Sequence, residues 1–328
     1  MREISFPEAI GEAQREEMRR DARVLLIGED VSRNLLGTSA GLLEEFGPDR
    51  VMDSPISEAG FTGAAAGAAM VGMRPIVDHG IATFMYTAMD QLVNIIAKSR
   101  YLYGGQLSVP LVIRCMMAYD GSMAAQHSDR PYPLYMGIPG LKVIVPSSPY
   151  DAKGLLKAAI RDDDPVMSFE DSTLWTATGP VPEEEYVIPL GQASIKREGS
   201  DVTAVAIAGA VRHTLGAAED LAQEGVSVEV IDPRTLVPLD LDRILTSVRK
   251  TGRLVAIDVA HKTCSAASEI SASVAEEAFD ALVAPVVRVA TPDIPIPFSP
   301  ALEKGLYPTR DRIARAIRQV MRGAAKRD

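Results

Sequence analysis

One acidic residue stands where a helix is expected to begin, directly after the turn that follows a short strand. The strand Arg50–Met52 leads into the turn Asp53-Ser54-Pro55-Ile56-Ser57, and Glu58 opens the helix. Ligands of parallel sheets bind outside the carboxyl ends of the strands, where a carboxyl group can hold or transfer a proton. The same acid could serve only its own helix, because a negative charge at a helix start interacts favourably with the macrodipole. Spacing alone leaves both interpretations of Glu58 open.

A second candidate is a histidine in a polar loop. The chain has four histidines, and His127 lies in the string Gln126-His127-Ser128-Asp129, within a region rich in glycine and proline. Imidazole can give or take a proton near neutral pH, so a loop histidine between two α/β units could act as an acid or base. A surface histidine without a function fits the sequence equally well.

A third candidate is the acidic string Asp162-Asp163-Asp164, which precedes Pro165. Three adjacent carboxylates could bind a cation, although such a run is also typical of a solvated turn between a helix and a strand. The familiar motifs are absent: no Gly-x-Gly-x-x-Gly opens a helix, and there is no Walker loop, zinc-spaced Cys/His cluster or Gly-x-Ser-x-Gly elbow. Polar residues at strand ends are therefore the candidates that remain.

The elements that must position these residues alternate between apolar strands and helical patterns. The expected strands are Arg23–Ile27, Pro75–Asp78, Pro110–Cys115, Lys142–Val145, Val166–Phe169, Val202–Ala208, Val228–Asp232, Leu254–Asp258 and Val286–Ala290. The expected helices are Glu58–Gly72, Tyr86–Tyr103, Pro149–Arg161, Ala217–Glu224, Leu241–Arg249, Ala267–Phe279 and Thr309–Met321. This alternation predicts an α/β fold with mainly parallel sheets covered on both faces.

A break in composition divides the two series of elements. The stretch Gly179-Pro180-Val181-Pro182-Glu183-Glu184-Glu185 combines prolines, a glycine and an acidic run, which is typical of a surface linker. We therefore predict two α/β domains, 1–180 and 191–328, joined by a linker at 181–190.

Composition and charge exclude several classes of protein. The chain has 328 residues, 47% hydrophobic and 24% charged, which is ordinary globular usage and excludes disorder and collagen. A net charge of −10 without a basic cluster argues against nucleic-acid binding. No apolar run reaches the roughly 18 residues of a membrane span, and the N-terminus has no signal or transit character. Two cysteines fit a reducing compartment, so we expect a cytoplasmic protein.

Several strings occur in one order along nearly the whole chain. They are Gly28-Glu29-Asp30-Val31, Asp53 to Glu58 with Gly60, Gly72-x-Arg74-Pro75, Met89-Asp90-Gln91-x-x-Asn94-x-x-Ala97-Lys98, Gln126-His127-Ser128, Pro139-Gly140-Leu141-Lys142-Val143, Asp151-Ala152-Lys153-Gly154-Leu155-Leu156, Asp164-Pro165 and Thr291-Pro292-Asp293-Ile294-Pro295. In these strings the chain resembles the beta subunit of the thiamine-diphosphate-dependent decarboxylase component of 2-oxo acid dehydrogenases. Pyruvate, branched-chain and acetoin dehydrogenases share this subunit.

The resemblance implies a transketolase-like pyrimidine-binding domain followed by a transketolase C-terminal domain. It also implies thiamine diphosphate shared with an alpha subunit, which holds the diphosphate and magnesium through a Gly-Asp-Gly motif that this chain lacks. Two alpha and two beta chains form a heterotetramer in this family. Together they decarboxylate a small 2-oxo acid and pass the acyl unit to the lipoyl group of an acyltransferase.

Residue roles follow from the matched positions. Glu58 matches the glutamate that hydrogen-bonds the aminopyrimidine ring nitrogen, Phe84 an aromatic residue that packs on the pyrimidine, and His127 a histidine on the thiazolium side. Five positions match those that hold a structural potassium ion in some members, largely through backbone oxygens: Leu111, Ala159, Ile160, Asp162 and Asp164.

The sequence departs from the family near the expected mouth of the site. Asp129 stands where glutamine usually follows His-Ser, and Gly137 stands where a second histidine is common. These changes keep a second reaction open, an acyloin or ketol transfer to another acceptor. A third possibility is a non-catalytic assembly subunit, although a scaffold would need neither Glu58 nor His127.

Overall fold

The computed structural model describes residues 1–323, which form two compact units. The first unit comprises Met1–Tyr119 and Gln126–Leu190. The second comprises Asp120–Ala125 and the chain from Gly191 onward. The residues expected to link two domains run along the first unit, where Ile188 is buried in the core and its backbone N–H donates to Gly154 O.

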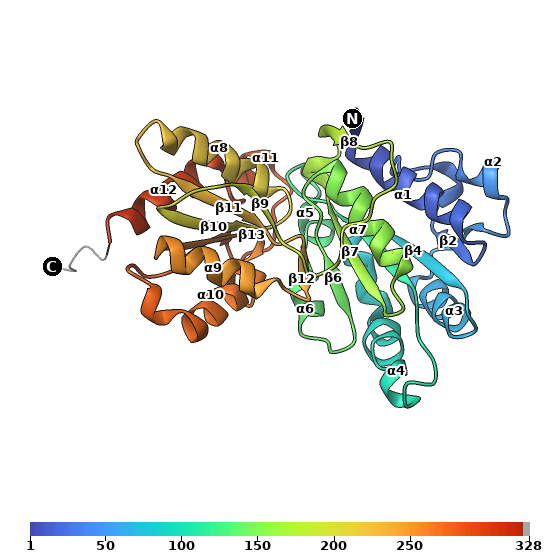
Figure 1. The fold of residues 1–328 in the computed structure, drawn as a ribbon. Helices are drawn as coiled ribbons and strands as arrows, with labels where there is room; N and C mark the ends of the chain where they lie inside the picture. Colours follow the sequence, from blue (N-terminus) through green and yellow to red (C-terminus); the bar gives the residue numbers. More distant parts are fainter. Residues whose placement is uncertain (324–328) are drawn as a thin grey trace. The chain divides into compact units, whose positions relative to one another are not determined.

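The first unit contains a parallel sheet in the order β6-β7-β5-β4-β2-β3 (Figure 1). Its strands are β2 (Val24–Gly28), β3 (Val51–Asp53), β4 (Arg74–Ile81), β5 (Val112–Met117), β6 (Lys142–Ile144) and β7 (Val166–Asp171). A separate antiparallel pair joins β1 (Arg2–Ser5) to β8 (Thr178–Val181). The predicted strands lie within or next to these segments, and the predicted parallel α/β class is confirmed.

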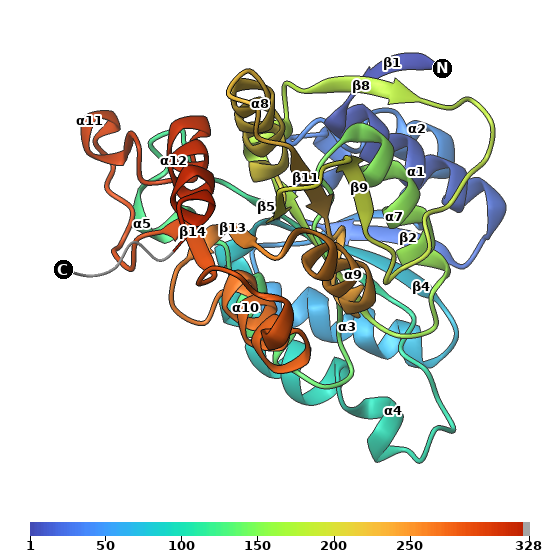
Figure 2. The same ribbon diagram turned by 60° about the vertical axis from the view of Figure 1, so that its left-hand side comes forward.

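Helices cover both faces of this sheet because its strands are apolar on both sides (Figure 2). Helices α1 (Phe6–Arg20) and α7 (Pro149–Arg161) share one buried core with Leu26 and Ile76. Helix α3 (Glu58–Met70) packs on the other face, where Phe61 meets Val77. The start of α1 is fixed by a capping box, in which Ser5 Oγ accepts from the Glu8 N–H and the Glu8 carboxylate accepts from the Ser5 N–H.

One predicted helix is wrong in part. The segment expected to be a single helix from Tyr86 to Tyr103 is divided into η2 (Ala82–Ala88, 3-10), η3 (Gln91–Ile96, π) and α4 (Ser99–Leu102). The π segment carries a side-chain ladder, in which Asn94 donates to Asp90 at 2.7 Å and Lys98 donates to Asn94 at 2.9 Å. Widened turns of this kind are often found near functional sites.

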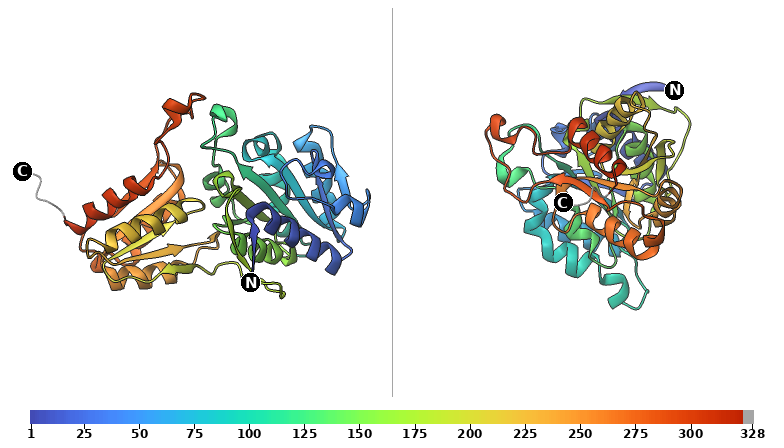
Figure 3. Two further views of the ribbon diagram at one scale, coloured as in Figure 1. Left: turned by 90° about the horizontal axis from the view of Figure 1, so that it is seen from above. Right: turned by 90° about the vertical axis from the view of Figure 1, so that its left-hand side faces the viewer.

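The second unit contains a sheet in the order β14-β13-β10-β11-β9, in which only β9 is antiparallel to its neighbour. The strands are β9 (Ser194–Arg197), β10 (Val202–Ala206), β11 (Val228–Asp232), β13 (Leu254–His261) and β14 (Val287–Thr291). The longer helices are α8 (Ala210–Ala222), α9 (Leu241–Thr251), α10 (Ala266–Glu277) and α12 (Arg310–Met321). Figure 3 shows this unit, in yellow to red, with helices on both sides of its sheet.

The remaining elements are short. They are η1 (Val31–Arg33), α2 (Leu42–Phe46), α5 (Ala124–His127), α6 (Tyr132–Met136), η4 (Ser172–Leu174), β12 (Thr235–Val237), η5 (Phe279–Ala281) and α11 (Pro300–Glu303). In the part of the chain that the structure describes, no helix is long and apolar enough to cross a membrane.

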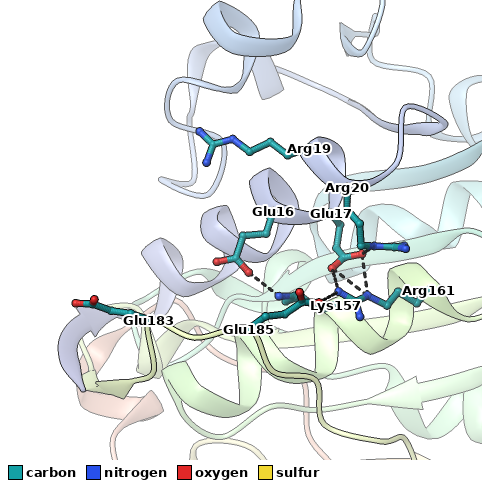
Figure 4. Close-up of a pocket in the computed structure, with 8 residues that line it drawn as sticks. All are labelled: Glu16, Glu17, Arg19, Arg20, Lys157, Arg161, Glu183 and Glu185. Carbon is teal, nitrogen blue, oxygen red and sulfur yellow. Dashed lines mark hydrogen bonds and ion pairs between the residues drawn. The ribbon is translucent and has the colours of Figure 1, made fainter.

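Buried ion pairs join α1 to α7 (Figure 4). Lys153 and Lys157 are fully buried, and their ammonium groups each lie 2.6 Å from a carboxylate oxygen of Glu16. A cleft of about 350 Å³ beside them is lined only by charged side chains, four acidic and four basic: Glu16, Glu17, Arg19, Arg20, Lys157, Arg161, Glu183 and Glu185. Because these charges balance, the cleft favours neither anions nor cations.

We expect Glu16→Gln to lower the free energy of unfolding by about 2 kcal/mol at pH 7, because Lys157 then loses its charged partner. Burial opposes the charge of Glu16, but both lysines outweigh it and lower the pKa of this carboxyl below its ordinary value of 4.5. Its contribution is therefore present above that value and is lost as the pH falls through the folded pKa. Urea unfolding measures the difference between wild type and variant, which should shrink as the pH is lowered through the folded pKa of Glu16.

The control for this prediction is Glu184→Gln, which makes the same charge change at an exposed position. Equal stability losses in Glu16→Gln and Glu184→Gln, or a difference that does not shrink as the pH is lowered, would contradict the assigned role of the buried pairs.

Candidate active site

Glu58 lies at the first position of α3, just beyond the carboxyl end of β3. The intervening turn is held by Asp53, whose carboxylate accepts a hydrogen bond of 2.8 Å from the Ser32 N–H. A Cβ at position 60, in the first turn of α3, would lie 2.5 Å from Ser57 Oγ, so a larger residue there would displace the Ser57 side chain. The carboxyl group of Glu58 is partly exposed at the edge of the sheet where ligands of such folds bind.

A second carboxyl group lies beside it. Glu29 follows β2 directly, and its Oε1 is buried without a hydrogen-bond partner. Burial, and then the negative charges of Glu58 and Asp30, raise the pKa of Glu29. Sequence analysis did not select Glu29 as a site residue. Its place at a strand end, in the string Gly28-Glu29-Asp30, was the signal that could have found it.

The structure brings two of the predicted site residues into contact. The rings of Phe84 and His127 lie 5.6 Å apart between centroids and meet edge to face at 77°. Phe84 lies in η2, which follows β4, while His127 ends α5, and both side chains are partly exposed. Helix α3, which carries Glu58, packs against η2. The three predicted residues therefore come from neighbouring elements at one edge of the first sheet.

Asp129, which stands where the family usually has glutamine, is hydrogen-bonded to a tyrosine. The Tyr86 hydroxyl donates to Asp129 Oδ2 at 2.9 Å. Burial and the neighbouring carboxylate raise the pKa of Tyr86, so its hydroxyl keeps its proton at neutral pH. Asp129 thus ties the loop after His127 to η2, the element that carries Phe84.

A buried histidine connects α3 to β4. His79 lies near the end of β4, and its Nε2 is 3.0 Å from the hydroxyl of Thr62, one helical turn beyond Glu58. Burial lowers the pKa of His79 to about 3, so the ring is neutral at any ordinary working pH. Its other nitrogen, Nδ1, is buried without a partner.

Unpartnered buried polar atoms are concentrated at this edge. Five such atoms lie in or just beyond the ends of β2, β3 and β4 and in the loop after β5: Glu29 Oε1, Ser54 Oγ, His79 Nδ1, Thr83 Oγ1 and Ser128 Oγ. Nearly all buried polar atoms in folded proteins form hydrogen bonds, so each exception needs an explanation. These carboxyl, hydroxyl and imidazole groups are available to form hydrogen bonds with water or with a polar ligand.

The residues matched to a potassium site lie at the opposite edge, where the strands begin. Leu111 precedes β5, and its carbonyl accepts from the Val166 N–H at 3.1 Å, while Ala159 O accepts from the Asp162 N–H at 3.2 Å. The buried Arg74 donates to the carbonyls of Ile160, at 2.8 Å, and Asp162. Two further side chains are already paired, because Lys142 reaches Asp162 at 2.7 Å and Asp164 at 3.3 Å. Among the described residues, no cluster of three His, Cys, Asp or Glu side chains could hold a metal ion.

Comparison with known families identifies both domains. Residues 2–174 match the family described as transketolase, pyrimidine binding domain, and residues 191–313 match transketolase, C-terminal domain. A solved structure titled "Split gene transketolase, inactive beta4 tetramer" superposes with a TM-score of 0.81 and covers 97% of this chain and 98% of its own. Its sequence identity of 23% supports the fold alone. The fold and its domains are those of transketolase-like enzymes that use thiamine diphosphate.

The similar proteins narrow this class to one subunit type. The chain is 49% identical over 326 residues to the beta subunit of acetoin:2,6-dichlorophenolindophenol oxidoreductase of Bacillus subtilis, with 95% of both chains covered. Identity to the beta subunit of the same name from Cupriavidus necator is 46%, with 98% of both covered. It is 44% to the mitochondrial pyruvate dehydrogenase E1 component subunit beta-2 of rice, covering 97% of this chain and 86% of that one.

The chain belongs to the family of beta subunits of two-component, thiamine-diphosphate-dependent 2-oxo acid dehydrogenases. The predicted family and the class of oxidoreductase are confirmed.

Proposed function

We propose that this chain, together with an alpha subunit, cleaves the carbon–carbon bond next to the carbonyl of a small 2-oxo acid, releases carbon dioxide and passes the acyl unit to a lipoyl carrier. The observation that carries the proposal is the edge where Glu58, Glu29, Phe84 and His127 meet a concentration of unpartnered buried polar atoms. Thiamine diphosphate, when bound, supplies the carbon nucleophile and the electron sink that this cleavage requires.

The roles of this chain's residues follow from their positions. Glu58 holds a proton against the ring nitrogen of the cofactor's pyrimidine, and Phe84 provides an apolar face for that ring. His127, whose ring contacts Phe84, moves a proton at the side where the acyl unit leaves. Glu29 places a second carboxyl group beside Glu58, and because its pKa is raised, Glu29 holds a proton more readily than an exposed glutamate does.

A second candidate reaction is the cleavage of an acyloin such as acetoin. The names of the Bacillus subtilis and Cupriavidus necator relatives, at 49% and 46% identity, favour it. The bond that breaks also lies next to a carbonyl, so the same residues serve, and an aldehyde leaves in place of carbon dioxide.

Product analysis distinguishes the two reactions. The chain is co-expressed with its alpha partner, and the purified complex is incubated with pyruvate, branched 2-oxo acids or acetoin, with and without a lipoyl domain. Carbon dioxide release from a 2-oxo acid, with acyl transfer to the lipoyl domain, supports the first candidate. Acetaldehyde release from acetoin supports the second. A complex that cleaves none of these substrates would overturn both.

The isolated chain should bind thiamine diphosphate weakly, because it lacks a Gly-Asp-Gly motif for the diphosphate and magnesium. We propose that an alpha subunit holds both in a heterotetramer of two alpha and two beta chains, within the cytoplasm. Isothermal titration of the chain alone should show little binding, whereas the co-expressed complex should bind the cofactor in the presence of magnesium. Tight, magnesium-dependent binding by the chain alone would contradict the proposal that the alpha subunit holds the diphosphate and magnesium.

We further propose that the residues at the opposite edge of the sheet hold a potassium ion with a structural role. Leu111, Ala159, Ile160, Asp162 and Asp164 would contribute the oxygens. Because Arg74 and Lys142 already engage part of this set, we expect the ion to add little, raising Tm by about 2 °C when potassium replaces sodium at constant ionic strength. Thermal unfolding in potassium, sodium and choline chloride measures the effect, and identical Tm values would contradict the site.

A further inference from the structure

The loop that leads to His127 has an unusual backbone. Three of its residues, none of them glycine, adopt positive φ angles: Asp120 at 58°, Ser122 at 59° and Ala124 at 61°. Left-handed backbone brings Cβ close to the following carbonyl oxygen in L-residues, so each of these conformations is costly unless other contacts impose it. A loop with three such residues within five positions requires contacts that hold it.

One buried carboxylate contacts two of the three residues. Glu303, the last residue of α11, is 3% exposed, and its Oε1 accepts a hydrogen bond from the Asp120 N–H at 3.0 Å. Its Oε2 accepts from the Ser122 N–H at 2.8 Å, and the Tyr307 hydroxyl donates to Oε1 at 2.6 Å. Amide groups that converge through left-handed residues form a concave site for anions, and here a carboxylate of the same chain fills it.

The residues held by this carboxylate come just before a proposed catalytic residue. By its contacts, the segment Asp120–Ala125 groups with the unit that contains Glu303, and α5 begins within that segment and ends at His127. We propose that Glu303 is a positioning residue, which imposes the left-handed loop and thereby sets the location of His127. This inference rests on the role of His127 in the proposed function.

A carboxylate suits this task better than any neutral side chain. Both of its oxygens accept, so it satisfies two converging N–H groups and a hydroxyl at once, and its charge strengthens each hydrogen bond. Glutamine has nearly the same shape but would turn an NH₂ group toward one of the N–H donors. Glu303→Gln therefore removes one of the two hydrogen bonds to the loop, and the negative charge, with little change in volume.

The test uses the co-expressed complex with the alpha partner and measures two half-reactions. In Glu303→Gln we expect acyl transfer to a lipoyl domain to fall at least about tenfold, because His127 is no longer held in place. Substrate cleavage measured with an artificial electron acceptor should stay within about twofold of wild type, since it depends on Glu58 and the cofactor. Equal losses in both half-reactions, or no loss of transfer, would overturn the proposal.

A glycine rescue separates positioning from a general loss of structure. Glycine adopts positive φ without the clash of a Cβ. Adding Ser122→Gly to Glu303→Gln should therefore raise the rate of acyl transfer at least about threefold over that of Glu303→Gln alone. Met123→Gly is the matched control, because the φ of Met123 is not positive, and it should restore nothing. Equal rescue by both glycines, or rescue by neither, would count against the proposal.

Two further variants keep the test decisive. If Glu303→Gln fails to assemble, Tyr307→Phe, which removes one donor to the same carboxylate, should show a smaller loss confined to transfer. A Tyr307→Phe complex with full transfer would then refute the inference.

His127→Ala is measured in parallel. If it keeps transfer, the proposed role of His127 fails; if it loses transfer while Glu303→Gln does not, only the inference about Glu303 fails.

Discussion

Replacing Glu58 with glutamine should remove nearly all turnover while leaving the protein folded. The substitution keeps the shape of the side chain but takes away the carboxyl group that we propose shares a proton with the cofactor's pyrimidine ring. General acid–base groups typically contribute about 10²–10⁴ in rate, so we expect a loss of that size in kcat. Steady-state kinetics of the co-expressed complex measure it, and unfolding curves should show unchanged stability within about 0.5 kcal/mol.

The control for Glu58 is an acid that also lies in the first turn of a helix but has no part in the site. Glu269 lies in the first turn of α10, in the second unit, so Glu269→Gln makes the same charge change near a helix start. If Glu58 served only the macrodipole of α3, both variants would lose a little stability and neither would lose turnover. That result would rule out the catalytic role assigned to Glu58.

Replacing His127 with alanine should separate the two half-reactions. We expect cleavage measured with an artificial electron acceptor to be spared, because it depends on Glu58 and the cofactor. Acyl transfer to the lipoyl domain should fall by about 10²-fold or more, since no other imidazole replaces the proton donor at that position. Single-turnover measurements of both half-reactions in the assembled complex test the prediction.

His213→Ala provides the matched histidine control, because His213 is exposed on α8 in the second unit. It should leave both half-reactions unchanged. If His127→Ala slows cleavage as much as transfer, the histidine binds substrate or assists the bond-breaking step itself. Its assignment to the transfer step would then be wrong.

The sequence predicted the fold well because strands buried on both faces leave a clear pattern. Strands such as β10, with all five residues buried, appear in the sequence as short, mainly apolar runs between helical patterns. The helix expected over Tyr86–Tyr103 was harder, because apolar periodicity cannot distinguish an α-helix from consecutive 3-10, π and α segments. That distinction depends on local hydrogen bonding, such as the ladder from Asp90 through Asn94 to Lys98.

The candidate site was predictable only in part. Glu58, Phe84 and His127 could be assigned because they match the family's motifs, and the structure adds the ring contact between Phe84 and His127. The sequence shows that Glu29 stands at a strand end, but it does not show the burial that raises the pKa of Glu29 or lowers that of His79. This burial is a property of the folded sheet rather than of adjacent residues.

The contacts of Glu303 could not be predicted from the sequence either, because they join residues that are far apart along the chain. It lies 183 positions from Asp120 and 181 from Ser122, the two residues whose amides it binds. Nothing in the local sequence of either segment indicates the pairing. Only the positive φ angles of the loop and the buried carboxylate, seen together, reveal it.

Hydrogen–deuterium exchange at the thiazolium carbon of thiamine diphosphate, followed by quenched-flow NMR, tests most directly whether this chain activates the cofactor. We expect exchange in the wild-type complex to be faster than for free cofactor by a factor of about 10² or more, and Glu58→Gln to return it close to the free rate. Exchange in His127→Ala should stay rapid, because that residue acts later. Exchange that remains rapid in Glu58→Gln would contradict the claim that this chain activates the cofactor through Glu58.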